Sequence, residues 1–215
     1  MQMRTILVVE DDPMTRGLLA EILDASGFRV ATASSGSDAR RICNLIDPDA
    51  VVMDVDLGVG PSGFDVADAM LADAPHLAFL FLTNLPDARF ASRDPKSLPA
   101  GAGYLRKEKL SRSGALIGAL ESVITGQLTS APRDDLDPAR PLAKLSKSQI
   151  AVLKMVAMGL SNQQIAVVRS TTVRAVQILL NKAIAVLGIE DVNEGSARVA
   201  AARTYIASAG LPVAK

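Results

Sequence analysis

Acidic side chains stand directly after two apolar runs in the first third of the chain. Glu10 and Asp11 follow ILVV, and Asp54 follows AVVM, with Asp56 two residues further on. Carboxylates brought together in one place repel one another unless a hard cation lies among them. Mg²⁺ takes oxygen ligands from a few carboxylates and from water. The residue types therefore predict a magnesium site built from Glu10, Asp11, Asp54 and Asp56.

A threonine and a lysine stand at the ends of two later apolar runs. Thr83 ends FLFLT, and Lys107 follows GYLR. The Asp54 carboxylate is suited to attack an incoming phosphoryl group, while the Lys107 ammonium neutralises charge on the phosphoryl oxygens and Thr83 offers them a hydroxyl. This chemistry describes a phosphoryl acceptor, and not an enzyme that turns over an external substrate.

Alternating apolar runs and helical patterns supply the elements that position these residues. Strands are predicted at TILVVE, FRVATA, DAVVMD, LAFLFL and GYLR, with helices at 13–25, 35–46, 63–73 and 111–124. Strand–helix alternation predicts an α/β doubly wound, five-stranded parallel sheet that is covered on both faces. The loops at the carboxyl ends of such strands gather in one crevice, so residues far apart in sequence meet there.

The runs ILVVEDDP, VVMDVDLG, FLFLT and GYLRK resemble, in order and spacing, the receiver domain of two-component response regulators. The resemblance covers residues 1–126 and implies a flavodoxin-like fold. It implies that a sensor histidine kinase, a phosphotransfer protein or a small acyl phosphate phosphorylates Asp54, with self-dephosphorylation as the only other activity. It also implies that Asp11 and Asp54 bind Mg²⁺ directly, Glu10 through water and Asp56 through its backbone carbonyl.

The same resemblance implies a switch, in which Thr83 and Tyr104 move toward the phosphoryl group. Two features depart from the receiver pattern. The family usually has Pro after the lysine, where this chain has Glu108, and the segment before the fifth strand contains Pro86, Pro95 and Pro99. Because proline interrupts helices, the fourth helix is predicted to be short or displaced. Both departures affect how the signal is transmitted and leave the phosphoryl chemistry intact.

The sequence Asp-Val-Asp at residues 54–56 also resembles the nucleophile loop of haloacid-dehalogenase-type phosphatases. Those enzymes place the motif on their first strand and use the second Asp as an acid and base. Here the motif follows the third strand and comes after an acidic pair that suits the receiver arrangement. A phosphatase is therefore the less favoured alternative, and turnover of a generic phosphomonoester would support it.

Charge and composition divide the chain into two halves. Residues 1–126 hold 12 Lys or Arg against 17 Asp or Glu, whereas residues 145–215 hold 8 against 3. The stretch TSAPRDDLDPARP between them is rich in proline and charge. It predicts a linker at 127–144 between a receiver domain at 1–126 and an output domain at 145–215. An acidic half suits a cation, and a basic half suits a phosphate backbone.

The second half has the pattern of a small all-α, four-helix domain. Helices are predicted at 146–158, 162–168, 173–187 and 195–209. Residues 145 to about 205 resemble the LuxR-type helix-turn-helix domain found behind many receivers. The positions that match this family are Leu145, Val152, Leu153, Gly159, Ser161, Asn162, Ile165, Ala166, Val176, Leu187 and Gly188.

The helix at 173–187 is the one that this resemblance places in the major groove of DNA. Its predicted core stripe is Val176, Leu180, Ile184 and Leu187. Gln177 suits a bidentate pair with adenine and Arg174 one with guanine. The predicted DNA-binding residues are Ser161, Asn162, Arg174, Gln177, Asn181 and Lys182.

This helix departs from the LuxR pattern in ways that leave a second function open. The family commonly has Thr, Lys and His where this chain has Ala175, Gln177 and Leu179, and the family's KLG ending is VLG here. Val173, Ile178, Leu179 and Val186 add apolar area, and exposed apolar surface often marks a protein interface. The chain is therefore either a transcription regulator that binds DNA under control of phosphorylation, or a phosphorylation-dependent regulator that binds a protein partner instead.

Three further expectations follow from the sequence. The last helix carries Val199, Ala202 and Ile206, which either close the small core or form a homodimer surface. Cys43 is the sole cysteine and His76 the sole histidine, which excludes an intramolecular disulfide and a cysteine-rich zinc site. No apolar stretch approaches the ~20 residues of a membrane span, so the sequence predicts a cytoplasmic protein without membrane contact.

Overall fold

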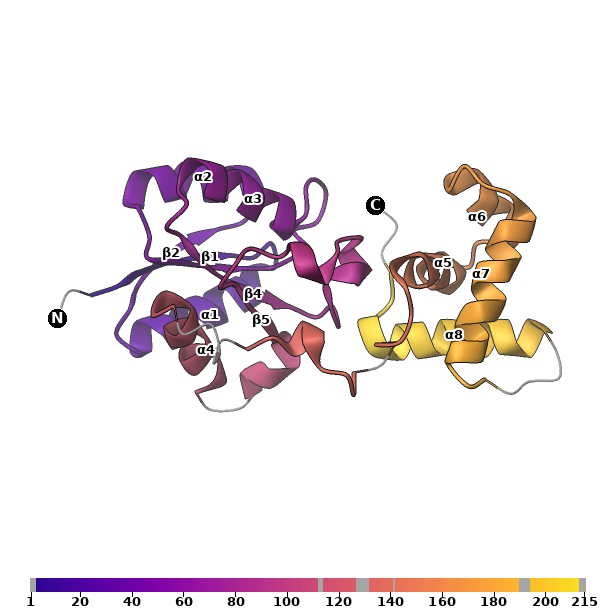
Figure 1. Cartoon of the computed structure of the whole chain (residues 1–215). Coiled ribbons are helices and arrows are strands. Elements are labelled where there is room, and N and C mark those ends of the chain that lie inside the picture. The colour runs from indigo at the N-terminus through magenta and orange to yellow at the C-terminus, as the bar shows by residue number, and fades with distance from the viewer. Residues whose placement is uncertain (1–2, 112–113, 127–131, 141, 190–193, 213–215) are drawn as a thin grey trace. The chain divides into compact units, whose positions relative to one another are not determined.

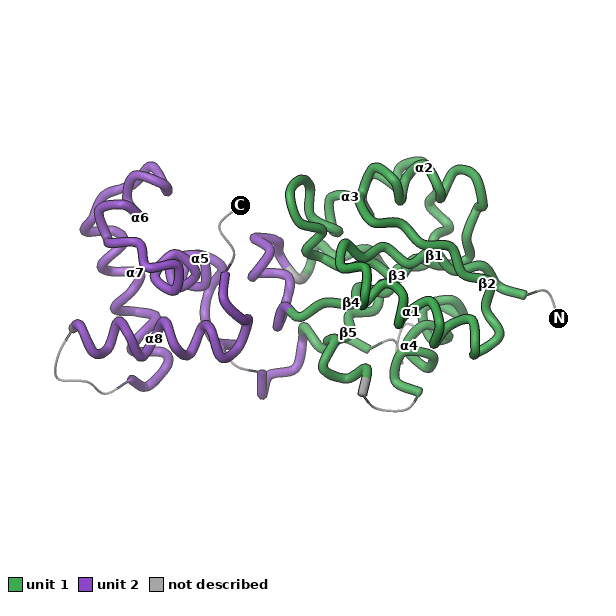
Figure 2. Tube along the Cα trace, turned by 180° about the vertical axis from the view of Figure 1, so that it is seen from behind, with its two compact units in different colours: residues 1–84, 96–135 green, residues 85–95, 136–215 purple. Residues whose placement is uncertain are grey.

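The chain forms two compact units. The computed structural model describes residues 3–111, 114–126, 132–140, 142–189 and 194–212. One unit contains Met1–Asn84 and Lys96–Asp135, and the other contains Leu85–Pro95 and Leu136–Lys215 (Figure 2). The second unit therefore includes a short stretch taken from within the N-terminal half.

The first unit is built on the predicted parallel sheet. Its strands are β1 (Thr5–Val9), β2 (Arg29–Ala33), β3 (Ala50–Met53), β4 (Ala78–Thr83) and β5 (Gly103–Arg106). They pair in parallel in the order β2-β1-β3-β4-β5, which confirms the doubly wound fold (Figure 1). The strand order reverses between β1 and β3, and in such sheets a crevice opens at that point, at the carboxyl ends of the strands.

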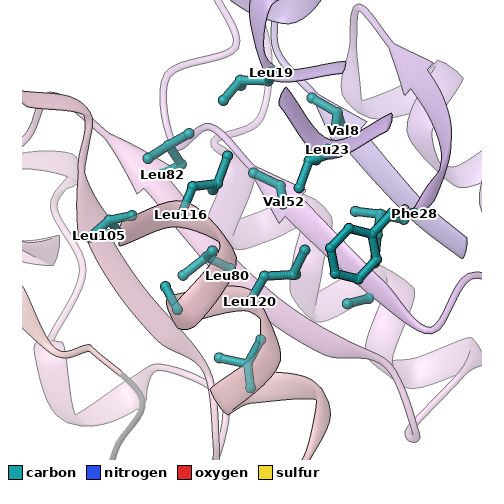
Figure 3. Close-up of a cluster of buried hydrophobic side chains, with 14 residues drawn as sticks. Val8, Leu19, Leu23, Phe28, Val52, Leu80, Leu82, Leu105, Leu116 and Leu120 are labelled. Carbon is teal, nitrogen blue, oxygen red and sulfur yellow. The ribbon is translucent and has the colours of Figure 1, made fainter. Parts of the chain in front are cut away.

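Helices cover both faces of the sheet. Among the described residues of this unit, the α-helices are α1 (Pro13–Ala25), α2 (Gly36–Ile46), α3 (Gly63–Asp73) and α4 (Ala115–Ile124). Helices α1 and α4 lie on one face, and α2 and α3 on the other (Figure 1). Leucines of α1 and α4 pack on Val8, Val52 and Leu80 of the sheet in one buried cluster (Figure 3). Burial of each such leucine stabilises the fold by about 1.5–3 kcal/mol.

No regular α-helix joins β4 to β5. The segment instead forms two short 3₁₀ turns, η1 (Ala88–Ala91) and η2 (Pro95–Ser97). This confirms the prediction of a short or displaced fourth helix, since each proline removes a backbone donor and clashes with the preceding turn. The predicted helix at 111–124 begins later, at Ala115, because residues Lys107–Ser111 form the 3₁₀ turn η3.

The displaced segment packs inside the second unit. Phe90 of η1 is 3% exposed and belongs to the core of that unit, with its ring centroid 5.5 Å from that of Tyr205. The Arg89 guanidinium donates to the backbone carbonyls of Ala143, at 3.1 Å, and of Leu145. Asp87 is fully buried and ion-paired with Arg89 at 2.8 Å. An apolar side chain and a buried ion pair thus fix this segment.

Part of the predicted linker is ordered against the edge of the sheet. The Tyr104 backbone N–H donates to the Pro132 carbonyl at 2.6 Å. The Arg106 N–H donates to the Asp134 carboxylate at 3.0 Å, and Lys109 pairs with the same carboxylate at 2.6 Å. These bonds satisfy donors of β5 that an edge strand would otherwise expose. The domain limits at 126 and 145 remain predictions.

The described part of the second unit consists chiefly of four helices, α5 (Lys147–Ala157), α6 (Asn162–Val168), α7 (Val173–Val186) and α8 (Glu194–Ala209). Ser146 and Ser161 begin α5 and α6 with capping boxes, and the Thr172 side chain caps α7. Each hydroxyl accepts a backbone N–H that the first helical turn leaves without a partner.

The predicted core of these helices needs small corrections. In α7, Val176 and Leu180 are buried as predicted, and Ala183 is buried with them, while Ile184 and Leu187 are only partly buried. In α8 the buried positions are Ala197, Ala201, Tyr205 and Ser208, and Val199 is 59% exposed. Ala201 is fully buried, and α8 packs against both α5 and α7. No helix within the described residues is long and apolar enough to cross a membrane.

Candidate functional site

Two buried carboxylates share one lysine at the crevice of the sheet. Glu10 directly follows β1, Asp54 directly follows β3, and Lys107 directly follows β5. The Lys107 ammonium lies 2.6 Å from Glu10 Oε2 and 2.8 Å from Asp54 Oδ2. Both carboxylates are buried, with 2% and 6% of their residue surfaces exposed. The parallel strands therefore bring together three predicted site residues, of which the first and the last lie 97 positions apart in the sequence.

Asp11 completes an acidic group with the two buried residues. Single carboxylate oxygens of Glu10, Asp11 and Asp54 all lie within 4.8 Å of one another. With Lys107, three ionised carboxylates leave a net charge of two minus, which a divalent cation would balance. Their oxygens are the donors that Mg²⁺ prefers, so the residues fit the predicted metal. Asp12 is set apart because its side chain caps α1 by accepting from the Thr15 N–H at 2.7 Å.

The backbone of Asp56 also lies at this site, whereas its side chain is exposed. The Asp56 N–H donates to Asp54 Oδ1 at 3.3 Å. This contact orients the Asp54 carboxylate toward the loop that follows β3. Because the role predicted for Asp56 uses its backbone carbonyl, an exposed side chain is compatible with that role.

The remaining receiver residues lie at the same edge of the sheet or next to it. Thr83 ends β4, is 1% exposed, and lies opposite Arg106 in the register of β4 and β5. Lys107 directly follows Arg106, so Thr83 and Lys107 lie at the carboxyl ends of neighbouring strands. Tyr104 is fully buried and lies opposite Phe81. The movement of Thr83 and Tyr104 stays a prediction.

Burial and like charge govern the proton affinities of this cluster. The pKa of Glu10 is raised from 4.5 to about 7, chiefly by burial and then by the Asp54 charge. Burial likewise raises the pKa of Asp54, against the opposing effect of Lys107. The pKa of Lys107 is raised because the charges of Asp54 and Glu10 outweigh its own burial. A cation bound here would favour the ionised carboxylates and so compete with protons.

We predict that the stability of the metal-free protein falls as pH rises toward neutrality. Between pH 4.5 and about 7 the folded protein holds a proton on Glu10 that the unfolded chain has released. The free energy of unfolding should therefore decrease across this window, by on the order of 3 kcal/mol if the full shift is expressed. Urea unfolding in a chelator at several pH values measures this slope. The variant Glu10→Gln should flatten it, and an equal slope in that variant would contradict the assignment.

Sequence reasoning missed one residue of this site, Gly63. It begins α3, and a Cβ built on it would lie 2.0 Å from the Asp54 carbonyl oxygen. Its N–H donates to the Val55 carbonyl at 2.9 Å. Only a residue without a side chain lets the start of α3 approach the backbone of the predicted phosphoryl acceptor so closely. A glycine at a helix start is too common a signal to have revealed this role.

The variant Gly63→Ala should therefore damage the site. The added methyl group must displace the Asp54 carbonyl or the first turn of α3, at a cost of about 1–3 kcal/mol. Phosphoryl incorporation at Asp54 should fall at least tenfold, measured by intact mass after treatment with acetyl phosphate and Mg²⁺. Gly17→Ala is the matched control, because no atom lies within 4 Å of a Cβ built in α1 at that position. Equal incorporation by both variants would contradict the close-packing argument.

The predicted DNA-binding residues lie on α6, α7 and the turn between α5 and α6. Arg174, Asn181 and Lys182 are exposed, whereas Asn162 and Gln177 are partly buried. Ser161 caps α6, where its hydroxyl accepts from the Gln164 N–H at 3.3 Å. The Gln177 side chain is held by the protein itself, since it accepts from Asn162 and donates to Asn181 at 2.9 Å. The amide predicted to pair with adenine is thus already engaged at both ends.

Comparison with known proteins agrees with this architecture. Residues 6–108 match the family described as the response regulator receiver domain. The nitrate/nitrite response regulator protein NarP of Escherichia coli (strain K12) is 28% identical over 218 residues, which cover 95% of this chain and 95% of that protein. The transcriptional regulatory protein LiaR of Bacillus subtilis (strain 168) is 26% identical, over 86% of this chain and 92% of its own length.

Among solved structures, the RcsB response regulator of Salmonella typhimurium matches both halves of the chain. Its TM-score is 0.54 at 16% identity, with 93% of this chain and 98% of that chain covered. At this identity the match concerns the fold alone, and it extends the likeness from the sheet to the C-terminal helices. Residues 6–108 therefore belong to the response regulator receiver family, and the chain is similar to the response regulator NarP and the regulatory protein LiaR over most of its length.

Proposed function

We propose that this response regulator is phosphorylated on Asp54 in the presence of Mg²⁺. The observation that carries the proposal is the buried ion pair of Asp54 with Lys107, at 2.8 Å, beside the carboxylates of Glu10 and Asp11. The phosphoryl donor is a sensor histidine kinase, a phosphotransfer protein or a small acyl phosphate. The metal would be held by Asp11, Asp54 and the Asp56 carbonyl, with Glu10 acting through water.

In this proposal an Asp54 carboxylate oxygen attacks the phosphorus atom of the donor. A new O–P bond forms as the bond between phosphorus and the donor breaks, and the leaving group departs with the bonding electron pair. The Lys107 ammonium, already within 2.8 Å of Asp54, neutralises charge that gathers on the phosphoryl oxygens. The Thr83 hydroxyl donates to another of these oxygens. When bound, Mg²⁺ supplies further positive charge to them and orients them.

Incubation of the full chain with acetyl phosphate tests this step directly. The mass of the intact protein should increase by one phosphoryl group in the presence of Mg²⁺ and should not increase in a chelator. The adduct should be lost in neutral hydroxylamine, because an acyl phosphate reacts with this nucleophile whereas a phosphoserine persists. Turnover of a generic phosphomonoester would instead support the phosphatase alternative.

We propose that the C-terminal helices bind DNA as the output of this signal. The relative LiaR is named a transcriptional regulatory protein, and the Salmonella RcsB structure is described in terms of DNA interaction. Helix α7 offers exposed Arg174, Asn181 and Lys182, which suit phosphate oxygens and the acceptor edges of bases.

Replacement of Arg174 and Lys182 by alanine should weaken DNA binding by the full chain. Each lost phosphate contact should reduce the slope of log affinity against log salt concentration by about 1. Fluorescence anisotropy with duplex DNA at several salt concentrations, with Mg²⁺ and a phosphoryl mimic present, measures both effects. Arg203→Ala is a matched control that removes an exposed charge from α8 instead of α7. Equal losses in the control and the double variant would argue against α7 as the DNA-reading helix.

One observation favours the alternative of a protein partner. Val173, Ile178 and Val186 of α7 are 44%, 46% and 44% exposed, which gives this helix an apolar surface outside its core. Leu179, which was expected to add to that surface, instead packs partly buried against the core. Absence of DNA binding by the phosphorylated full chain even at low salt would favour the protein-binding function.

A further inference from the structure

An arginine from the last helix donates to the start of α6. Arg198 of α8 donates from Nη1 to Asn162 Oδ1 at 2.7 Å and from Nη2 to the Leu160 carbonyl oxygen. The side chains of Arg198 and Asn162 are both partly buried. A guanidinium has five N–H donors and no acceptor, so Arg198 must be the donor in both hydrogen bonds. The Asn162 amide must direct its oxygen toward Arg198.

This fixed oxygen determines the orientation of two more amides on α7. Because Asn162 Oδ1 faces Arg198, its Nδ2 faces Gln177 and donates to Gln177 Oε1. The Gln177 Nε2 then faces Asn181 and donates to Asn181 Oδ1 at 2.9 Å. The group of Asn181 that remains for other partners is its Nδ2, which carries only N–H donors. Asn181 is exposed, so these donors are available at the surface of α7.

Without Arg198 the same three amides would have two equivalent arrangements. In the reverse arrangement Asn181 donates to Gln177, Gln177 donates to Asn162, and Asn181 presents its acceptor oxygen outward. Both arrangements contain the same number of amide hydrogen bonds. Only a partner that always donates, placed at one end of the three amides, makes one arrangement more stable than the other. If the amides took the reverse arrangement in the presence of Arg198, the N–H donors of Asn162 would face the N–H donors of the guanidinium. Neither group would then have an acceptor at this contact.

We propose that Arg198 is a positioning residue that sets Asn181 to present N–H donors, so that α7 reads hydrogen-bond acceptors of DNA. Arg174 lies seven residues before Asn181 on the same helical face, and it too is exposed and carries only donors. The matching chemistry in the major groove is guanine, whose O6 and N7 are both acceptors, in preference to the amino groups of cytosine and adenine. Gln177 serves as a relay in this arrangement and does not contact a base. The proposal rests on DNA binding by this chain.

The variant Asn181→Asp changes the group that residue 181 presents outward and keeps the hydrogen bond that this residue accepts from Gln177. An aspartate at this position still accepts from Gln177 Nε2, but it replaces the outward N–H donors by an acceptor oxygen. Binding of the full chain to its preferred duplex should weaken at least tenfold in anisotropy titrations at fixed salt. Replacement of guanine by 7-deazaguanine in the duplex should weaken the wild type more than the variant, in which Arg174 still donates to guanine but residue 181 does not. Equal sensitivity of both proteins to 7-deazaguanine would overturn the assignment of Asn181.

The pair Arg198→Lys and Arg198→Gln tests the polarity of the relay. Lysine keeps a side chain that only donates, whereas glutamine both donates and accepts and so permits either arrangement. Lysine should therefore retain the base preference and glutamine should lose it, although both variants lose the guanidinium packing. If the two variants behave alike, Arg198 has a structural role only.

Side-chain amide exchange in the DNA-free full chain gives a separate measurement. In ¹⁵N spectra one amide proton each of Asn162 and Gln177 should exchange slowly with solvent, and both amide protons of Asn181 should exchange fast. Slow exchange at Asn181 together with fast exchange at Asn162 would overturn the proposed polarity. Failure of the wild type to bind any duplex would overturn DNA reading by Asn181, and the amide exchange would then show whether Arg198 still orders the relay.

Discussion

Replacement of Asp54 by asparagine is expected to abolish phosphoryl incorporation from acetyl phosphate. The amide occupies almost the same volume as the carboxylate, but it carries no negative charge and is a poor nucleophile. Asp54 is buried at the end of β3, with its Oδ2 atom 2.8 Å from the Lys107 ammonium. Intact-protein mass spectrometry after treatment with acetyl phosphate and Mg²⁺ should show the phosphorylated species in the wild type and none in Asp54→Asn.

Asp56→Asn is the matched control for this experiment. It makes the same chemical change two residues away, on an exposed side chain. The metal contact predicted for Asp56 comes from its backbone carbonyl, which this substitution keeps. Incorporation should persist in this control. Continued incorporation in Asp54→Asn, or equal loss in both variants, would contradict the assignment of Asp54. The metal-free Asp54→Asn protein should unfold at no lower temperature than the wild type, because it loses one of three carboxylates that repel one another.

The clustering of Glu10, Asp54 and Lys107 was predictable from sequence because each of these three residues directly follows a strand. Glu10, Asp54 and Lys107 carry side chains that reveal their role, and a parallel sheet places the ends of its strands together. Nothing further had to be known about the loops. Gly63 was not predictable in this way, because its contribution is a missing side chain beside the Asp54 carbonyl.

The second unit was predictable as four helices but not in its side-chain partners. Capping residues and glycine stops defined the helix limits, whereas the contacts of Gln177 depend on α6 and α8 arriving beside α7. Arg198 lies 36 positions after Asn162, and no periodicity signals that the two side chains are bonded. A polar residue on the exposed stripe of a predicted recognition helix was therefore interpreted as free to contact a base.

The packing of the segment after β4 could not be predicted from the sequence either. Its prolines predicted that a regular helix would fail there, but they do not say what the released residues contact. Phe90 is the only large apolar side chain of 88–91, and its burial against Tyr205 joins positions 115 residues apart. Since Thr83 ends β4, the chain continues directly from a predicted switch residue into the core of the second unit.

Replacement of Phe90 by alanine should therefore destabilise the C-terminal helices, although residue 90 belongs to the N-terminal half of the sequence. Removal of a buried phenylalanine side chain costs about 3–5 kcal/mol, which is a large part of the stability of a small unit. Hydrogen exchange measured by mass spectrometry should show faster exchange in α5 and α8. The strands β1 and β3 should keep their protection, since their core contains no part of the segment at 85–95.

Phe79→Ala is the matched control, because it removes the same side chain from a residue that is 2% exposed and lies only eleven positions earlier, on β4. Its ring packs beside Phe81 at 6.0 Å within the sheet unit. This variant should therefore increase exchange in the strands and spare α5 and α8, the reverse of Phe90→Ala. If both variants increase exchange in the same elements, the boundary between the two units does not fall after β4, and the segment that follows Thr83 is part of the receiver after all.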